Sequence, residues 1–192
     1  MGLTKQQPLY NFVSGLMVYS KKDKREKEDM SMEQYLAATR EMHNTFKKDP
    51  TAAKQIKFLP MEIQKVWSDR LPGGTTKEYV SIVKKINSRS YFDTNTQRNL
   101  DGLMEALLEN PINRTYLKHA GMKGGSTPFV LTIAMYATTT DGDQTEFAYF
   151  FNDLEAIEGT LLQKNMNEFN LKIIKDAEQR KKLVEILNSN TH

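Results

Sequence analysis

The chain has 192 residues, 39% of them hydrophobic and 27% charged, which is enough to bury one sizeable core and favours a single domain over residues 1–192. Its 27 Lys and Arg residues against 24 Asp and Glu give a formal net charge of only +3, and acidic residues interrupt the densest basic run, residues 21–27. Because a nucleic-acid-binding surface concentrates positive charge, we expect a solvated linker there and no nucleic-acid partner.

Cysteine is absent, which excludes disulfides, thiolate catalysis and zinc sites built on cysteine. The histidines His43, His119 and His192 are too scattered to suggest a metal site or a catalytic triad, so we predict no metal and interpret His119 as a polar loop residue. No apolar run approaches the length of a bilayer span, and we expect no membrane-spanning segment.

The first apolar segment, residues 12–19, is short enough for the core of a signal peptide. Only Lys5 precedes it, however, and no small-residue cleavage site follows. Leu9, Phe12 and Leu16 belong to a set with helical spacing, so we predict a buried helix and no signal peptide. Any export signal of a parent protein would then lie upstream.

The rest of the first half also predicts helices, which begin at a proline or at a Ser or Thr three residues before Gln or Glu. These starts are Ser31 with Gln34, Pro60, Thr75 with Glu78, and Thr94 with Gln97. Pro50, the turn at residues 71–74 and Asn110-Pro111 mark their ends, so the last helix would include Leu107 and Leu108.

The second half predicts an antiparallel sheet. Residues 127–139 are rich in β-branched and aromatic side chains, Asp141-Gly142 favours a hairpin turn, and residues 145–151 form the partner strand. We expect an edge strand over residues 114–122. A stripe of apolar residues then marks an amphipathic helix that covers one face, namely Leu154, Ile157, Leu161, Met166, Phe169 and Ile173. The predicted fold class is α+β, with a helical first half, a three-stranded antiparallel sheet and a C-terminal helix.

The most informative stretch is Lys123-Gly124-Gly125-Ser126-Thr127, between the two predicted strands. A lysine ammonium attracts a ligand carboxylate, glycine admits a close backbone approach, and a neighbouring hydroxyl can donate to the same carboxylate. A Gly-rich turn, in which Lys123 only closes the connection, is the structural alternative.

This stretch resembles the Lys-Thr/Ser-Gly motif of class A β-lactamases and penicillin-binding proteins, which in that family lies on a strand bordering the active-site cleft. Residues 68–192 are similar in element order to the C-terminal portion of such serine hydrolases, and residues 1–67 are less so. The resemblance implies a β-lactamase/transpeptidase-like fold, acyl transfer on β-lactams or D-Ala-D-Ala-type peptides, no cofactor, and a periplasmic or secreted parent protein. It assigns carboxylate binding to Lys123, Gly125, Ser126 and Thr127.

The sequence also departs from the family. Gly124 stands where a Thr or Ser is expected, no Ser-Asp-Asn or Tyr-x-Asn is present, and Ser68-Asp69-Arg70 only imitates the former. The family acylates the serine of Ser-x-x-Lys at a helix start. Here the only such spacing is Ser81-Ile82-Val83-Lys84, inside a Lys-rich helix that generates it by chance. We expect the nucleophile to precede the chain as given.

Glu62 stands about where a class A omega-loop base would be sought, although a glutamate at a helix start is also favoured by the helix dipole. Whether the chain is an enzyme is therefore open. It is either a catalytically incomplete hydrolase domain, or a non-catalytic module that binds cell-wall peptides or associates with itself through an exposed sheet edge. An unrelated α+β domain is a third possibility.

Overall fold

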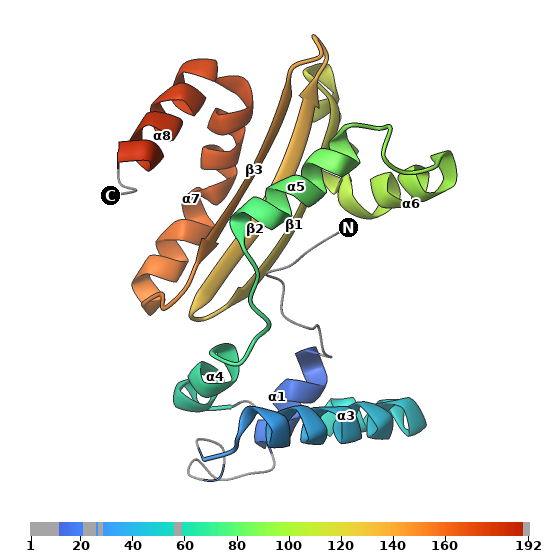
Figure 1. Cartoon of the computed structure of the whole chain (residues 1–192), viewed down its shortest axis with the longest axis vertical. Helices are drawn as coiled ribbons and strands as arrows, with labels where there is room; N and C mark the ends of the chain where they lie inside the picture. The colour runs from blue at the N-terminus through green and yellow to red at the C-terminus, as the bar shows by residue number, and fades with distance from the viewer. Residues whose placement is uncertain (1–11, 21–25, 27–28, 56–58, 190–192) are drawn as a thin grey trace.

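In the computed structural model, residues 12–20, 26, 29–55 and 59–189 are described. Helices come first, followed by a three-stranded antiparallel sheet and two C-terminal helices, which confirms the predicted α+β arrangement (Figure 1). The helices are α1 (Phe12–Ser20), α3 (Met32–Lys48), α4 (Met61–Ser68), α5 (Thr76–Asn87), α6 (Thr94–Met104), α7 (Ala156–Lys175) and α8 (Ala177–Ser189), with short 3-10 turns η1 (Pro50–Gln55), η2 (Ala106–Glu109) and η3 (Asn113–Thr115). The strands are β1 (Leu117–Thr127), β2 (Val130–Thr139) and β3 (Gln144–Phe151).

The helices α1, α3 and α4 form a cluster at one end of the sheet (Figure 1). Their shared core contains Tyr19, Tyr35 and Trp67, so the predicted buried helix at residues 12–19 is confirmed where its side chains are described. Arg70, just after α4, places its guanidinium 5.5 Å from the Tyr35 ring centre, which holds the following linker to this cluster. Leu9, Lys5 and the predicted linker at residues 21–27, apart from residue 26, lie outside the described residues.

Local capping explains where the helices begin. The capping box of Ser31 and Gln34 is present, and the Thr75 hydroxyl accepts the Glu78 backbone N–H. The predicted cap at Thr94 is wrong by one residue. The helix is capped by Asp93, whose carboxylate accepts the backbone N–H groups of Asn95 and Thr96 at 3.0 Å each.

The predicted end of that helix is also wrong. α6 stops at Met104, and Leu107 and Leu108 belong to the separate turn η2, which packs against β1. The spacing of the leucines continues a helical stripe, but tertiary contact with the sheet redirects the backbone after Glu105.

The Gly-rich stretch is part of a strand, which corrects the predicted boundaries. β1 continues through Thr127, and β2 begins at Val130 after a tight Pro128-Phe129 turn. Antiparallel pairing persists across the glycines, with Lys123 opposite Ala134 and Gly125 opposite Thr132, so ladder hydrogen bonds override their weak strand propensity. The predicted Asp141-Gly142 hairpin turn is confirmed, with Gly142 at a φ of +97°.

The sheet has strand order β1-β2-β3 and carries helices on both faces (Figure 1). On one face Ala134 and Tyr136 pack against Val83 and Ile86 of α5. On the other face Ile133, Met135 and Ala137 pack against the C-terminal half of α7, where Ile174 joins the same core. Only part of the predicted apolar stripe is buried. Leu154, which precedes α7, and Ile173 on α7 are buried, but Ile157 and Leu161 are 75% and 53% exposed.

Among the described helices, none combines the length and the apolar composition that a membrane span requires.

Candidate functional site

A cleft of about 500 Å³ opens between the sheet and the segment that leads from α4 into α5. Strands β1, β2 and β3 form its floor on the α5 face, and Tyr79 of α5 closes one side, where its ring meets Phe150 edge-on at 5.2 Å. The polar lining consists of Ser68, Asp69, Lys123, Thr132, Asn152 and Asp153. Residues 71–74 and the backbone of Gly124 and Gly125 complete it.

Lys123 lies on the floor of this cleft. It is directly opposite Ala134, whose side chain packs against α5, so the lysine side chain leaves β1 on the same face. The Lys123 ammonium donates a 3.0 Å hydrogen bond to the carbonyl of Gly124 and has no carboxylate partner among the described residues. An ammonium has three donors, so this one retains donor capacity for an anionic ligand.

The two glycines differ in what surrounds them. A Cβ at Gly124 would lie 2.6 Å from Ile133 Cδ1 and 3.0 Å from the Thr132 carbonyl, on the face away from the cleft. Glycine at position 124, where the resemblance led us to expect Thr or Ser, therefore suits tight packing against β2. A Cβ at Gly125 would meet only Thr132 Oγ1, at an ordinary 3.4 Å, so Gly125 leaves open space on the cleft floor.

The two predicted hydroxyls lie differently from Lys123. Ser126 is exposed and, by strand alternation, is on the opposite face of the sheet. Thr127 is on the cleft face, but its Oγ1 lies 2.8 Å from Ser68 Oγ and accepts the Phe129 N–H. The hydroxyl on the cleft floor is that of Thr132, which donates to the Gly125 carbonyl at 3.2 Å.

Glu62 is exposed in the first turn of α4 and does not line the cleft. The cleft carboxylates are instead those of Asp69 and Asp153, which sequence reasoning missed as a pair. Ser81 and Lys84 are exposed on α5 and also lie outside the lining. The serine that does line the cleft, Ser68, is buried and bonded to Thr127.

The ammonium of Lys65 joins these two carboxylates. Its Nζ lies 2.5 Å from Asp69 Oδ1 and 2.9 Å from Asp153 Oδ1, which links α4 to the second residue after β3. Asp153 has a φ of +54°, in the left-handed region that lets the chain turn sharply there. Hydrogen bonds to Asp69 and then Asp153 raise the pKa of Lys65 above its usual value, so the lysine stays charged.

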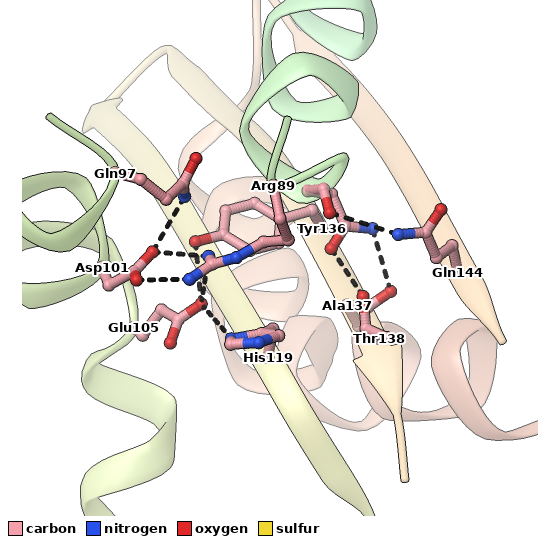
Figure 2. Close-up of polar contacts among 10 residues, drawn as sticks. Arg89, Gln97, Asp101, Glu105, His119, Tyr136, Ala137, Thr138 and Gln144 are labelled. Carbon is pink, nitrogen blue, oxygen red and sulfur yellow. Dashed lines mark hydrogen bonds and ion pairs between the residues drawn. The ribbon is translucent and has the colours of Figure 1, made fainter. Parts of the chain in front are cut away.

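A second polar cluster anchors α5 and α6 away from the cleft (Figure 2). The Arg89 guanidinium donates to both oxygens of Asp101, at 2.6 and 2.5 Å. Glu105 accepts the Tyr136 hydroxyl at 3.1 Å and lies 3.3 Å from His119 Nδ1. His119 is therefore a strand residue in a charged cluster. It lies within the predicted edge strand over residues 114–122, and its interpretation as a loop residue is wrong.

This cluster perturbs the protonation of its members. Burial raises the pKa of the Asp101 carboxyl, but the hydrogen bonds from Arg89 and Gln97 outweigh burial and hold that pKa below its usual value. Burial, followed by the charge of Glu105, raises the pKa of Tyr136 far above that of a free tyrosine. The cluster is a structural ion-pair network that fixes the end of α5 opposite to the cleft. Within the described ranges, no group of three His, Asp or Glu side chains is arranged to hold a metal ion.

Comparisons of the chain with protein-family models, with curated protein sequences and with solved structures gave no match.

Proposed function

We propose that the cleft binds the carboxylate of a β-lactam or of a D-Ala-D-Ala-type peptide, as the carboxylate-binding part of a β-lactamase-like serine hydrolase domain. The observation that carries the proposal is the position of Lys123, a cation on a cleft floor without a carboxylate partner among the described residues. A unit positive charge in a concave, partly apolar site attracts an anion more strongly than the same charge on a flat surface.

The surroundings of Lys123 support a peptide-like ligand. Gly125 leaves the strand backbone accessible from the cleft, so a ligand amide can approach β1 closely. Thr132 offers a hydroxyl beside the same glycine, and the Tyr79 and Phe150 rings form an apolar wall. A ligand with a carboxylate for Lys123, an amide for the strand at Gly125 and an apolar group for the aromatic wall would fit this cleft.

Among the described residues, the cleft does not contain a serine hydroxyl with a free base beside it, which acyl transfer requires. Serine esters form when a base takes the proton of the attacking hydroxyl. Ser68 shares its hydrogen bond with Thr127, and the nearest lysine along α4, Lys65, is engaged by two carboxylates. The function that this geometry supports best is therefore reversible binding, with no acylation by the described residues.

A fluorescent penicillin tests the proposal. Fluorescence polarisation should show saturable binding that is lost in Lys123→Ala and kept in Lys118→Ala, an exposed lysine of the same strand outside the cleft. Intact mass should show no covalent adduct. Equal binding by both variants would show that Lys123 does not bind the ligand carboxylate. Covalent labelling of Ser81 would show that the alignment with the family is wrong.

A second candidate function is self-association. No strand pairs with the outer edge of β3 in the described part of the chain. Tyr149 of β3 contacts both Phe151 of β3 and Phe169 of α7, and these two phenylalanines are 38% and 41% exposed. Unpaired strand backbone next to exposed aromatic side chains favours pairing with another strand, and a second copy of this chain offers the same edge.

A further inference from the structure

A second cavity, of about 250 Å³, lies on the face of the sheet opposite to the Lys123 cleft. Met122 and Met135 are directly opposite each other in the pairing of β1 with β2, and both line this cavity from the sheet. Leu107 of η2 and Ile174 of α7 add to its lining, and both belong to the core on the α7 side. The cavity therefore lies between the sheet, α7 and the segment that contains η2.

The buried polar group of this cavity is the amide of Asn170. The side chain comes from α7, is only 4% exposed and lines the cavity. Its Oδ1 accepts the Tyr149 hydroxyl at 3.1 Å, but its Nδ2 donates no hydrogen bond to any described residue. Buried N–H groups are nearly always paired in proteins, and an unpaired one destabilises the fold. The acceptor for this amide should therefore lie inside the cavity.

A water molecule is a poor occupant of this position, because a buried water needs about two to four hydrogen bonds. The Asn113 amide, which also lines the cavity, is engaged at both ends. Its Nδ2 donates to the Leu107 carbonyl at 2.7 Å, and its Oδ1 accepts the Tyr116 hydroxyl at 2.8 Å. The other two asparagines of the lining, Asn110 and Asn167, are exposed. A carbonyl oxygen needs only one donor, and an apolar body attached to it would cover the leucine, isoleucine and methionine side chains.

We propose that this cavity binds a small uncharged molecule whose carbonyl oxygen, on an apolar body about the size of one ring, accepts a hydrogen bond from Asn170 Nδ2. None of the described residues that line it is charged, so an ionic ligand would lose its hydration without gaining a counter-charge. An apolar cavity of about 150 Å³ holds a benzene molecule, so about 250 Å³ leaves room for a ring with a short substituent. The site is independent of Lys123, because it lies on the other face of the sheet.

Acetophenone and α-methylstyrene test the site, because they have the same shape and only acetophenone has a carbonyl oxygen. Each is titrated into the full chain labelled with ¹³C in its methionine methyl groups, and NMR follows the signals. Acetophenone should shift the Met122 and Met135 signals saturably. The signals of Met32 and Met61, which are exposed on α3 and α4, should stay in place. Acetophenone should bind about threefold to tenfold more tightly than α-methylstyrene, as expected for one hydrogen bond.

Asn170→Leu should abolish this ratio, because the variant has no amide donor. The same substitution at Asn165, which is exposed on α7 and does not line the cavity, should keep it. Tyr149→Phe with Asn170→Leu repeats the test without leaving the tyrosine hydroxyl unpaired, should the single variant be unstable. A ratio that persists without the amide, or equal affinity of the wild-type chain for both molecules, would overturn the proposed ligand class. Stationary Met122 and Met135 signals at millimolar acetophenone, or equal shifts of the two exposed methionines, would overturn the site itself.

Discussion

Ser68 and Thr127 are 59 positions apart in the chain, yet their hydroxyl oxygens lie 2.8 Å apart and join the end of α4 to the end of β1. With the Lys65 to Asp153 contact, this hydrogen bond connects the helical cluster to the sheet beside the cleft that Ser68 and Asp153 line. Among the described residues the helical cluster and the sheet have separate apolar cores, so these polar contacts link the two across the cleft.

Ser68→Ala should lower the free energy of unfolding by about 1 kcal/mol, because Thr127 loses its hydroxyl partner. Urea denaturation measures this change. Thr127→Val should have a similar effect, and the double variant should cost less than the sum of the two. Ser126→Ala, an exposed neighbour, is the control; if it were equally destabilising, the loss could not be assigned to this hydrogen bond.

Asn87→Ala should cost about 2 to 4 kcal/mol, the largest loss among single polar substitutions proposed here. The side chain is fully buried, donates to Glu146 Oε1 at 2.6 Å and accepts the Thr138 hydroxyl at 2.7 Å. Thermal unfolding checks it against Asn99→Ala on the exposed surface of α6. A loss no greater than that of the control would contradict the anchoring of α5 by this residue.

Acid should remove the stabilisation from Asp101. Its folded-state pKa is depressed, so its contribution is complete above the pKa of the unfolded chain, about 4, and is lost as pH falls through the lower folded value. The melting temperatures of the wild-type protein and Asp101→Asn should therefore differ at pH 6 and converge toward pH 2. A constant difference across this range would refute the ion pair with Arg89 as its source.

Gly125→Ala should fold normally and bind carboxylate ligands more weakly. The added methyl meets only Thr132 Oγ1 at 3.4 Å, but it occupies open space on the cleft floor. Gly102→Ala, with nothing within 4 Å and a helical backbone, is the matched control and should stabilise the chain by about 0.5 to 1 kcal/mol. Unchanged penicillin affinity in Gly125→Ala would place the ligand elsewhere.

Phe151→Lys should reduce self-association, because a charge at a strand edge opposes pairing with a second strand. Sedimentation velocity over a range of protein concentrations measures the effect. Leu103→Lys, an equally drastic change on the exposed side of α6, is the control. A wild-type chain that stays monomeric at every concentration would contradict the second candidate function.

Local signals in the sequence predicted the elements well where one residue decides the geometry. Ser31, Thr75 and Asp141-Gly142 each act through a cap or a turn within three residues, and each lies where it was expected. Lys123 and Gly125 line a cleft, as the family resemblance implies for that motif, while their binding of a carboxylate stays a prediction.

Long-range pairing could not be predicted in the same way. The contact of Lys65 with Asp153 spans 88 positions, and neither residue belongs to a motif, so nothing in the sequence indicated that Asp69 and Asp153 meet in the cleft. The continuation of β1 through two glycines depends on its partner strand, and the buried side of α7 depends on where that helix meets the sheet. These features follow from tertiary packing, which the spacing of residue types along the sequence does not reveal.

The most direct test of the carboxylate site is the NMR signal of the Lys123 ε-methylene group, assigned with Lys123→Arg, during a titration with N-acetyl-D-Ala-D-Ala. The proposed site predicts a saturable shift of the Lys123 signal and a stationary Lys118 signal. A ligand that binds while the Lys123 signal stays in place would contradict it.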